Sequence, residues 1–280
     1  MRNTATGYKR RDLTATALTA NGLTIAHLPM HGSVYGADGA ADFENRSPSP
    51  AALGASLSIT GTTTNIWSAN AGWYTPSANS YASVKTQAAV DLFDMANSTS
   101  VLVALNLYHT GDPSAELTLI DAASNNSAAA NGGGFCVRMN TSGVVGVVGR
   151  DSVLGSSLGT NASKDVTAQT AVRIPIVFVV DCVGKTASSY FNGVFHSSSS
   201  WPGTLPQPPA SWGVTIGARA ATASTFDNYA GNGANGCRIS NVWIMRSTSG
   251  ILLPSVAGVA ADLAEAPAEI PRTLLRLMGL

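Results

Sequence analysis

Apolar residues alternate with polar or small residues in short runs along most of this chain, and turn-forming residues separate the runs. The clearest run predicts one strand face made of Val101, Val103, Leu105 and Leu107, and an opposite face made of Leu102, Ala104, Asn106 and Tyr108. The stretches AELTLIDA, GGFCVRMN and GVVGVVGR predict further strands, separated by Asp-Pro, Asn-Asn-Ser and Ser-Gly turns. Short strands at this spacing are typical of an antiparallel sandwich of about ten to twelve strands.

The pattern is weaker before residue 100. LTIAHLPM predicts one strand, and the alternation from Leu53 to Ile59 predicts one or two more. Residues 68–90 carry several aromatic residues and no clear period, so a loop is expected there.

The stretch from Arg173 to Arg246 has the strongest strand pattern of the chain. RIPIVFVVD is a continuous β-branched and aromatic run, as expected of a strand covered on both faces. Asn192-Gly193 predicts a tight hairpin, because both residues accept a positive φ. VTIG and CRISNVWIMR follow as a short and a long strand. We expect these strands to form one antiparallel sheet unit.

The two ends of the chain lack strand alternation. Residues 1–22 are rich in Thr and Ala and mildly basic, which predicts an extended arm that is either disordered or ordered against a neighbour. After Leu253 the pattern predicts a short helix at about 255–264 and another after Pro271. This tail has an apolar stripe that packs on its own sandwich or docks into another subunit. The predicted division is thus an arm (1–22), a sandwich (23–253) and a helical tail (254–280).

Composition narrows the classes of function. Hydrophobic residues make up 45% of the chain, charged residues only 11%, and the formal net charge is zero. A surface poor in charge suits a protein that is largely covered by neighbours, and zero net charge argues against general nucleic-acid binding. No run is apolar enough for a membrane span or a signal peptide. The odd number of cysteines predicts buried thiols in a reducing compartment, with no cofactor implied.

The order of motifs in the last third resembles a known superfamily. Val179–Asp181 end a strand as "VVD", Tyr190–Gly193 read Y-F-N-G, Ile216-Gly217 close a short strand, and Ile239, Val242 and Ile244 follow I-x-x-V-x-I. This order resembles the C-terminal half of the concanavalin A-like lectin/glucanase (laminin-G-like) jelly roll, and residues 101–149 match it loosely. The resemblance implies an all-β, antiparallel two-sheet sandwich. The Ala/Ser/Thr-rich composition with a helical tail is similar to versions that tailed bacteriophages encode as virion proteins.

Glucanase chemistry, which that superfamily includes, lacks its residues in this sequence. Retaining glycosidases use two carboxylates about 5 Å apart on a strand. Of the four glutamates, none has a second acidic residue two or three positions away on a predicted strand. We therefore expect no enzymatic activity, and we expect the histidines to be ordinary surface residues. Asp227 and Asn228 are the best calcium candidates, but two loop oxygens fall far short of a full coordination shell.

Two hypotheses about function remain open. The first is a structural virion protein of a tailed phage, assembled in the bacterial cytoplasm, that binds the capsid or tail surface as a decoration, minor capsid or tail protein. Its partners are other virion proteins and further copies of itself, and the superfamily resemblance suggests a trimer. The residues expected to dock on neighbours lie at both ends of the chain: Arg2, Lys9, Arg10, Arg11, Ile270, Leu274, Leu277 and Met278.

The second hypothesis is a carbohydrate- or receptor-binding module of a phage tail fibre or spike, which contacts a host-surface glycan. Aromatic rings stack on sugar faces, and the candidates in or beside predicted loops are Trp73, Tyr74, Trp201, Trp212 and Tyr229. The alternative role of these residues is to anchor the core and the loops.

Overall fold

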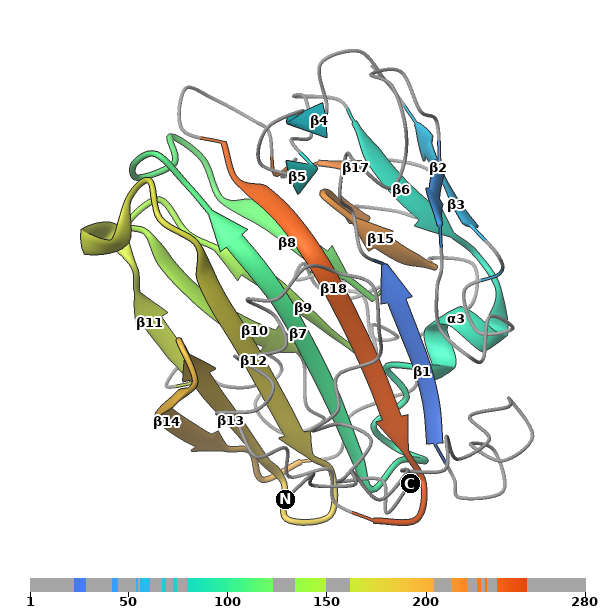
Figure 1. Ribbon diagram of the computed structural model, residues 1–280. Helices are drawn as coiled ribbons and strands as arrows, with labels where there is room; N and C mark the ends of the chain where they lie inside the picture. Colours follow the sequence, from blue (N-terminus) through green and yellow to red (C-terminus); the bar gives the residue numbers. More distant parts are fainter. Residues whose placement is uncertain are drawn as a thin grey trace, which may run out of the picture.

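The computed structural model describes residues 23–28, 42–44, 54, 56–60, 67–68, 73–74, 80–122, 134–149, 162–203, 213–220, 226–227, 230 and 236–250. Within these residues the chain folds into two antiparallel sheets that face each other, with very little helix (Figure 1). The predicted all-β, two-sheet sandwich is confirmed. No described helix has the length and apolar character needed to cross a membrane.

The first sheet has the strand order β14-β13-β12-β7-β18-β5-β4, and β1 pairs with the free side of β18. Its strands are β1 (Leu23–Leu28), β4 (Trp67–Ser68), β5 (Trp73–Tyr74), β7 (Ser100–Tyr108), β12 (Ile174–Asp181), β13 (Thr186–Phe191), β14 (Val194–Ser200) and β18 (Arg238–Ser247).

The second sheet has the order β11-β10-β9-β8-β15-β6-β3-β2. Its strands are β2 (Asp42–Glu44), β3 (Ser56–Thr60), β6 (Tyr81–Val84), β8 (Leu117–Asp121), β9 (Phe135–Met139), β10 (Val144–Gly149), β11 (Ser163–Asp165) and β15 (Val214–Ile216). A small separate pair, β16 (Arg219–Ala220) and β17 (Phe226–Asp227), follows β15.

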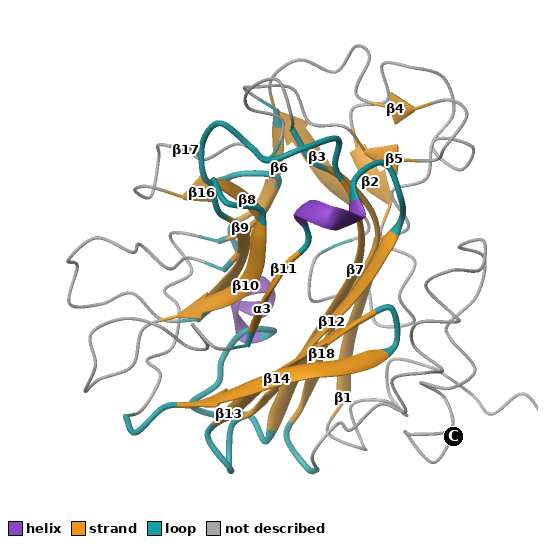
Figure 2. Cartoon of the chain, turned by 90° about the vertical axis from the view of Figure 1, so that its left-hand side faces the viewer, coloured by secondary structure: helices purple, strands orange, loops and turns teal. Residues whose placement is uncertain are grey.

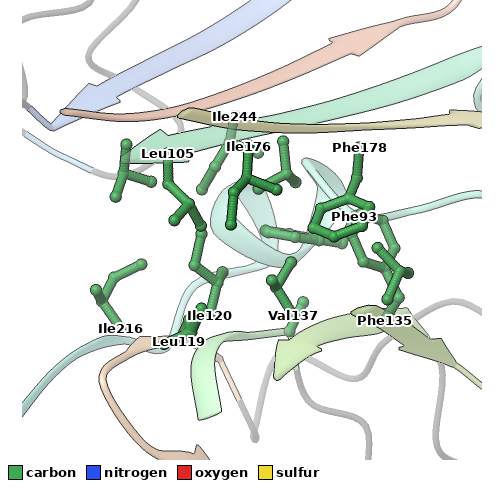
Figure 3. Close-up of a cluster of buried hydrophobic side chains, with 14 of the residues drawn as sticks. Phe93, Leu105, Leu119, Ile120, Phe135, Val137, Ile176, Phe178, Ile216 and Ile244 are labelled. Carbon is green, nitrogen blue, oxygen red and sulfur yellow. The ribbon is translucent and has the colours of Figure 1, made fainter. Parts of the chain in front are cut away.

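The core lies between the sheets, where alternate residues of both sheets meet (Figure 3). Phe178 of β12 contacts Phe191 edge-to-face at 6.1 Å between ring centroids, and Phe93 contacts Phe135 of the second sheet at 5.0 Å. Each such ring removes a large apolar area from water, which stabilises the fold by about 2–3 kcal/mol. The sequence folds this way because the apolar positions recur every second residue, which places them on one face of each strand.

The Asn192-Gly193 hairpin is confirmed. Asn192 has φ 53° and Gly193 has φ 76°, so both central residues of the turn between β13 and β14 occupy the left-handed region. Two successive residues with positive φ give the type I′ turn, whose twist matches that of the flanking strands. The turn leaves Val194 and Phe195 at the exposed start of the edge strand β14.

The prediction that the strands from 173 to 246 form one sheet unit is wrong. The short strand β15 belongs to the second sheet, between β8 and β6, whereas β18 pairs with β7 and β1 in the first. Alternation of apolar residues identifies a strand but not its neighbour, and consecutive strands of a sandwich commonly cross between sheets.

The prediction of a loop at 68–90 is also wrong for the described part of that stretch. It contains β5, β6 and the short helix α3 (Gln87–Asp91). Thr86 caps the helix by accepting a hydrogen bond from the Ala89 amide at 3.2 Å. The predicted arm and tail lie outside the described residues, so the division at 22 and 253 stays a prediction.

Candidate functional site

The candidate site is the outer face of the second sheet, which points away from the core. Inward-facing Val137 and Met139 alternate on β9 with outward-facing Cys136 and Arg138. The strand register places Thr118 of β8 opposite Arg138, and Asp121 opposite Cys136. Polar side chains therefore gather on the outer side of β8 and β9.

The β16–β17 pair is tied onto this face by a buried carboxylate. Asp121 is 0% exposed, and its Oδ2 accepts a hydrogen bond from the backbone amide of Ala220 at 2.8 Å. A buried carboxylate is costly unless it is hydrogen-bonded, so this contact fixes the position of the pair over β8.

The β16–β17 pair carries a partly exposed ion pair. Arg219 donates two hydrogen bonds to the carboxylate of Asp227, from Nε at 2.7 Å and from Nη2 at 2.6 Å. The pKa of Arg219 is raised above its ordinary value, chiefly by this hydrogen-bonded carboxylate, and the charges of Glu116 and Asp121 add to the effect. The two side chains are 21% and 39% exposed, so a ligand can reach both.

A second ion pair stands on the same face. Arg138 Nη1 lies 2.8 Å from Glu116 Oε2, and both side chains are about a quarter exposed, at 28% and 27%. The charge of Glu116 also raises the pKa of Arg219, so the two ion pairs form one electrostatic cluster. Because each pair joins a donor-only guanidinium to an acceptor-only carboxylate, the cluster offers both kinds of hydrogen-bonding group to a ligand.

Two buried threonine hydroxyl groups also lie on this face of the second sheet. Thr118 and Thr215 are 0% exposed, and in the described structure neither Oγ1 has a hydrogen-bond partner. The register places Thr215 next to Asp121. Among the described residues no group of three or more His, Cys, Asp or Glu side chains lies close enough to hold a metal ion.

The structure places the predicted sugar-contact residues apart. Trp201 is buried in the core with 4% exposure, so its ring cannot stack on a ligand in this structure, and the prediction for this residue is wrong. Trp73 and Tyr74 form β5 of the first sheet, where Tyr74 pairs with Ile239 of β18. Trp212 and Tyr229 lie outside the described residues.

Of the predicted calcium and docking residues, the structure describes only Asp227. Asp227 is hydrogen-bonded to Arg219 through both carboxylate oxygens, and the positive charge of this guanidinium disfavours a calcium ion at the same carboxylate. Asn228 lies outside the described residues, as do all the predicted docking residues: Arg2, Lys9, Arg10, Arg11, Ile270, Leu274, Leu277 and Met278.

The expectation of surface histidines is wrong for two of the four. His27 and His109 are buried, at 3% and 0% exposure, while His196 is exposed and His31 lies outside the described residues. His27 pairs across the sheet with Trp243, and the ring nitrogens of His109 lie 3.1–3.2 Å from the carbonyl oxygens of Val166 and Gly111. A carbonyl oxygen only accepts, so a neutral His109 ring, which has one N–H, donates to one of these two carbonyls.

All three cysteines are described, and none forms a disulfide. Cys136 and Cys237 are buried, and Cys182 is partly buried. Burial raises the pKa of Cys237 to about 12, and burial together with the Asp181 and Asp94 charges raises that of Cys182 to about 12. The prediction of buried thiols holds for two of the three.

Comparison with known proteins gives structural but no sequence relatives. No family model and no curated protein matches the sequence. The receptor-binding domain of a botulinum neurotoxin of mosaic serotype C/D is similar over 86% of this chain and 51% of that one, with 13% identity and a TM-score of 0.56. A Trypanosoma rangeli sialidase, in complex with a difluoro sugar acid, is similar over 89% of this chain and 34% of that one, with 12% identity and a TM-score of 0.52.

A sialic-acid-binding module is a weaker match. The CBM40 of a Ruminococcus gnavus sialidase, bound to α2,3-sialyllactose, covers 65% of this chain and 92% of its own, with 12% identity and a TM-score of 0.45. The chain spans only about a quarter of the sialidases that it matches at 22% identity. At these identities, the two matches with TM-scores above 0.5 show an antiparallel β-sandwich fold and nothing finer.

Proposed function

We propose that this chain is a non-enzymatic carbohydrate-binding module whose ligand lies on the outer face of the second sheet, beside the β16–β17 pair. The observation that carries the proposal is the cluster of two partly exposed pairs, Arg219–Asp227 and Arg138–Glu116, on the outer side of the second sheet. Sugar hydroxyls both donate and accept hydrogen bonds, so a surface that alternates donor forks with carboxylates suits a polyol. Rigid strands beneath the cluster hold it in one geometry before the ligand arrives.

The chain also supplies aromatic residues next to this face in the sequence. Trp212 directly precedes Gly213 and β15, and Tyr229 follows Asp227 by two residues. A ring beside a polar cluster provides the apolar contact that sugar faces require, while the cluster orients the hydroxyls. We therefore expect these two rings, rather than Trp201, to contribute to binding.

The structural matches support a binding module through the fold. The two matches with TM-scores above 0.5 are named as a toxin's receptor-binding domain and as a sialidase in complex with a sugar acid. The chain covers 51% of the first and 34% of the second, so the activity of neither whole protein transfers with the fold.

A glycan array probed with the full chain tests the proposal, followed by calorimetric titration of the strongest hit. Arg219→Ala should weaken binding at least about tenfold, which corresponds to about 1.4 kcal/mol. Arg173→Ala is the matched control, because Arg173 is exposed and directly precedes β12 of the first sheet. An array without hits, or equal losses in the two variants, would refute the proposed site. Chromatography of the hit after incubation tests the non-enzymatic part, for which no product is expected.

The virion setting stays a prediction, as do the oligomeric state and the partners at the chain ends. Neither the fold nor the matched structures bear on them. Immunogold labelling of phage particles with an antibody to this chain would test the setting directly, and unlabelled particles would refute it.

A further inference from the structure

The first sheet has a second apolar face, which points away from the core. Two rows of cross-strand neighbours run over β1, β18, β7 and β12 on this face. The rows are Ile25–Met245–Leu102–Val179 and His27–Trp243–Ala104–Val177. None of these side chains belongs to the cluster between the sheets, yet each is between 0% and 3% exposed.

Three side chains of this outer face, His27, Asn241 and Trp243, pair their polar atoms with one another. The His27 ring stacks on the Trp243 indole at 3.6 Å between centroids and 9° between planes. Asn241 Oδ1 lies 2.8 Å from His27 Nε2 and accepts a hydrogen bond from Trp243 Nε1 at 3.1 Å. Asn241 reaches both rings from an irregularity in β18, where its φ is 52°. The pairing of these three side chains lets them be covered without leaving their hydrogen-bonding atoms unsatisfied.

No described helix or strand lies over this face. Figures 1 and 2 show the strands of the second sheet and helix α3 on the core side of the β12-β7-β18-β1 layer. The rows are nevertheless between 0% and 3% exposed, so their burial needs a cover that the described strands and helices do not supply.

We propose that this cover is the chain's own C-terminal segment, residues 251–280. Its starting point is fixed beside the face: the Gly250 amide donates to Thr99 Oγ1 at 3.1 Å, and the Thr99 hydroxyl donates to the Gly250 carbonyl at 2.7 Å. Even if fully helical, residues 251–280 span about 45 Å at 1.5 Å per residue. This exceeds the roughly 33 Å length of the ten-residue strand β18.

The C-terminal segment also fits the chemistry of the face better than the N-terminal one. It carries the stripe Ile270, Leu274, Leu277 and Met278, whereas residues 1–22 are rich in Thr and Ala and contain the basic run Lys9-Arg10-Arg11. Covering an apolar face with apolar side chains is favourable, while burying unpaired basic groups there is costly.

Photo-crosslinking in the full chain tests this assignment. Leu277→p-benzoylphenylalanine places the probe on the stripe, and Arg272→p-benzoylphenylalanine is the matched control on the opposite side of the expected helix. After irradiation at low protein concentration, the Leu277 probe should react within its own chain. Its main product should include the tryptic peptide ISNVWIMR (239–246), which contains Trp243 and Met245, and the yield should exceed that of the control several-fold.

Three outcomes would overturn the proposal: cross-links between two chains only, cross-links that avoid β7, β12 and β18, or equal yields from both probes. Deletion of residues 251–280 gives an independent measurement. It should raise the binding of an apolar dye several-fold, and deletion of residues 1–21 should not. The reverse pattern would assign the cover to the N-terminal arm and refute the proposal.

Discussion

The hydrogen bond from the Ala220 amide to Asp121 makes a sharp prediction about the candidate site. Both residues are 0% exposed, so Asp121→Ala leaves a buried amide without its acceptor. The loss of such a bond to a charged acceptor destabilises a protein by about 2–3 kcal/mol. Asp121→Asn keeps an acceptor oxygen in place and removes only the charge that favours Arg219, so about 1 kcal/mol is expected.

Urea unfolding of the two variants, followed by tryptophan fluorescence, measures this difference. With a slope of about 2–3 kcal/mol per M, Asp121→Ala should lower the urea midpoint by about 1 M and Asp121→Asn by less than half of that. Asp121→Ala should also weaken glycan binding, because Arg219 and Asp227 lose the anchor of their strands.

Two results would refute this reasoning. If Asp121→Ala changes the free energy of unfolding by less than about 0.5 kcal/mol, the contact does not hold the β16–β17 pair in place. If both variants cost the same, the charge rather than the hydrogen bond is responsible.

Three further predictions concern the framework. Phe178→Ala should lower the free energy of unfolding by about 3–5 kcal/mol in the same urea assay, because it leaves a cavity between the sheets; a loss below 1 kcal/mol would contradict the assigned packing. Gly193→Val should cost about 1–2 kcal/mol or more by thermal unfolding, because φ is 76° there, and Val183→Ala at an exposed turn is a control expected to change little. The raised pKa of Cys237, about 12 against 9.0 ordinarily, means that the unfolded chain ionises first. The contribution of Cys237 to stability should be constant below about pH 9 and fall between about 9 and 12, so Cys237→Ala should reduce the fall in that range; an unchanged slope would contradict the assignment.

The strands that the sequence predicts well are those whose own residues determine them. β7 and β12 are long runs of β-branched and apolar residues, and the Asn192-Gly193 turn requires only its two residues. The pairing of β15 with β8 and β6 was missed because it depends on contacts between strands far apart in the chain.

The candidate site depends on contacts of the same long-range kind. Asp121 and Ala220 are 99 positions apart, and nothing near either residue indicates the other. The sequence did single out Asp227, but as a calcium ligand. Arg219, a basic residue eight positions before Asp227, is the nearby sequence feature that indicates an ion-pair partner for Asp227. Trp201 was misassigned because a tryptophan beside a Pro-rich stretch looks the same whether its ring faces water or the core.

The position of β18 has a consequence for synthesis. The last described strand of the chain lies in the middle of the first sheet, between β7 and β1 (Figure 1). While residues 200–237 are being translated, β1 and β7 have already been made. The strand that pairs with both of them, β18, has not. The first sheet must therefore stay incomplete until β18 emerges, and products truncated before β18 should aggregate or be degraded.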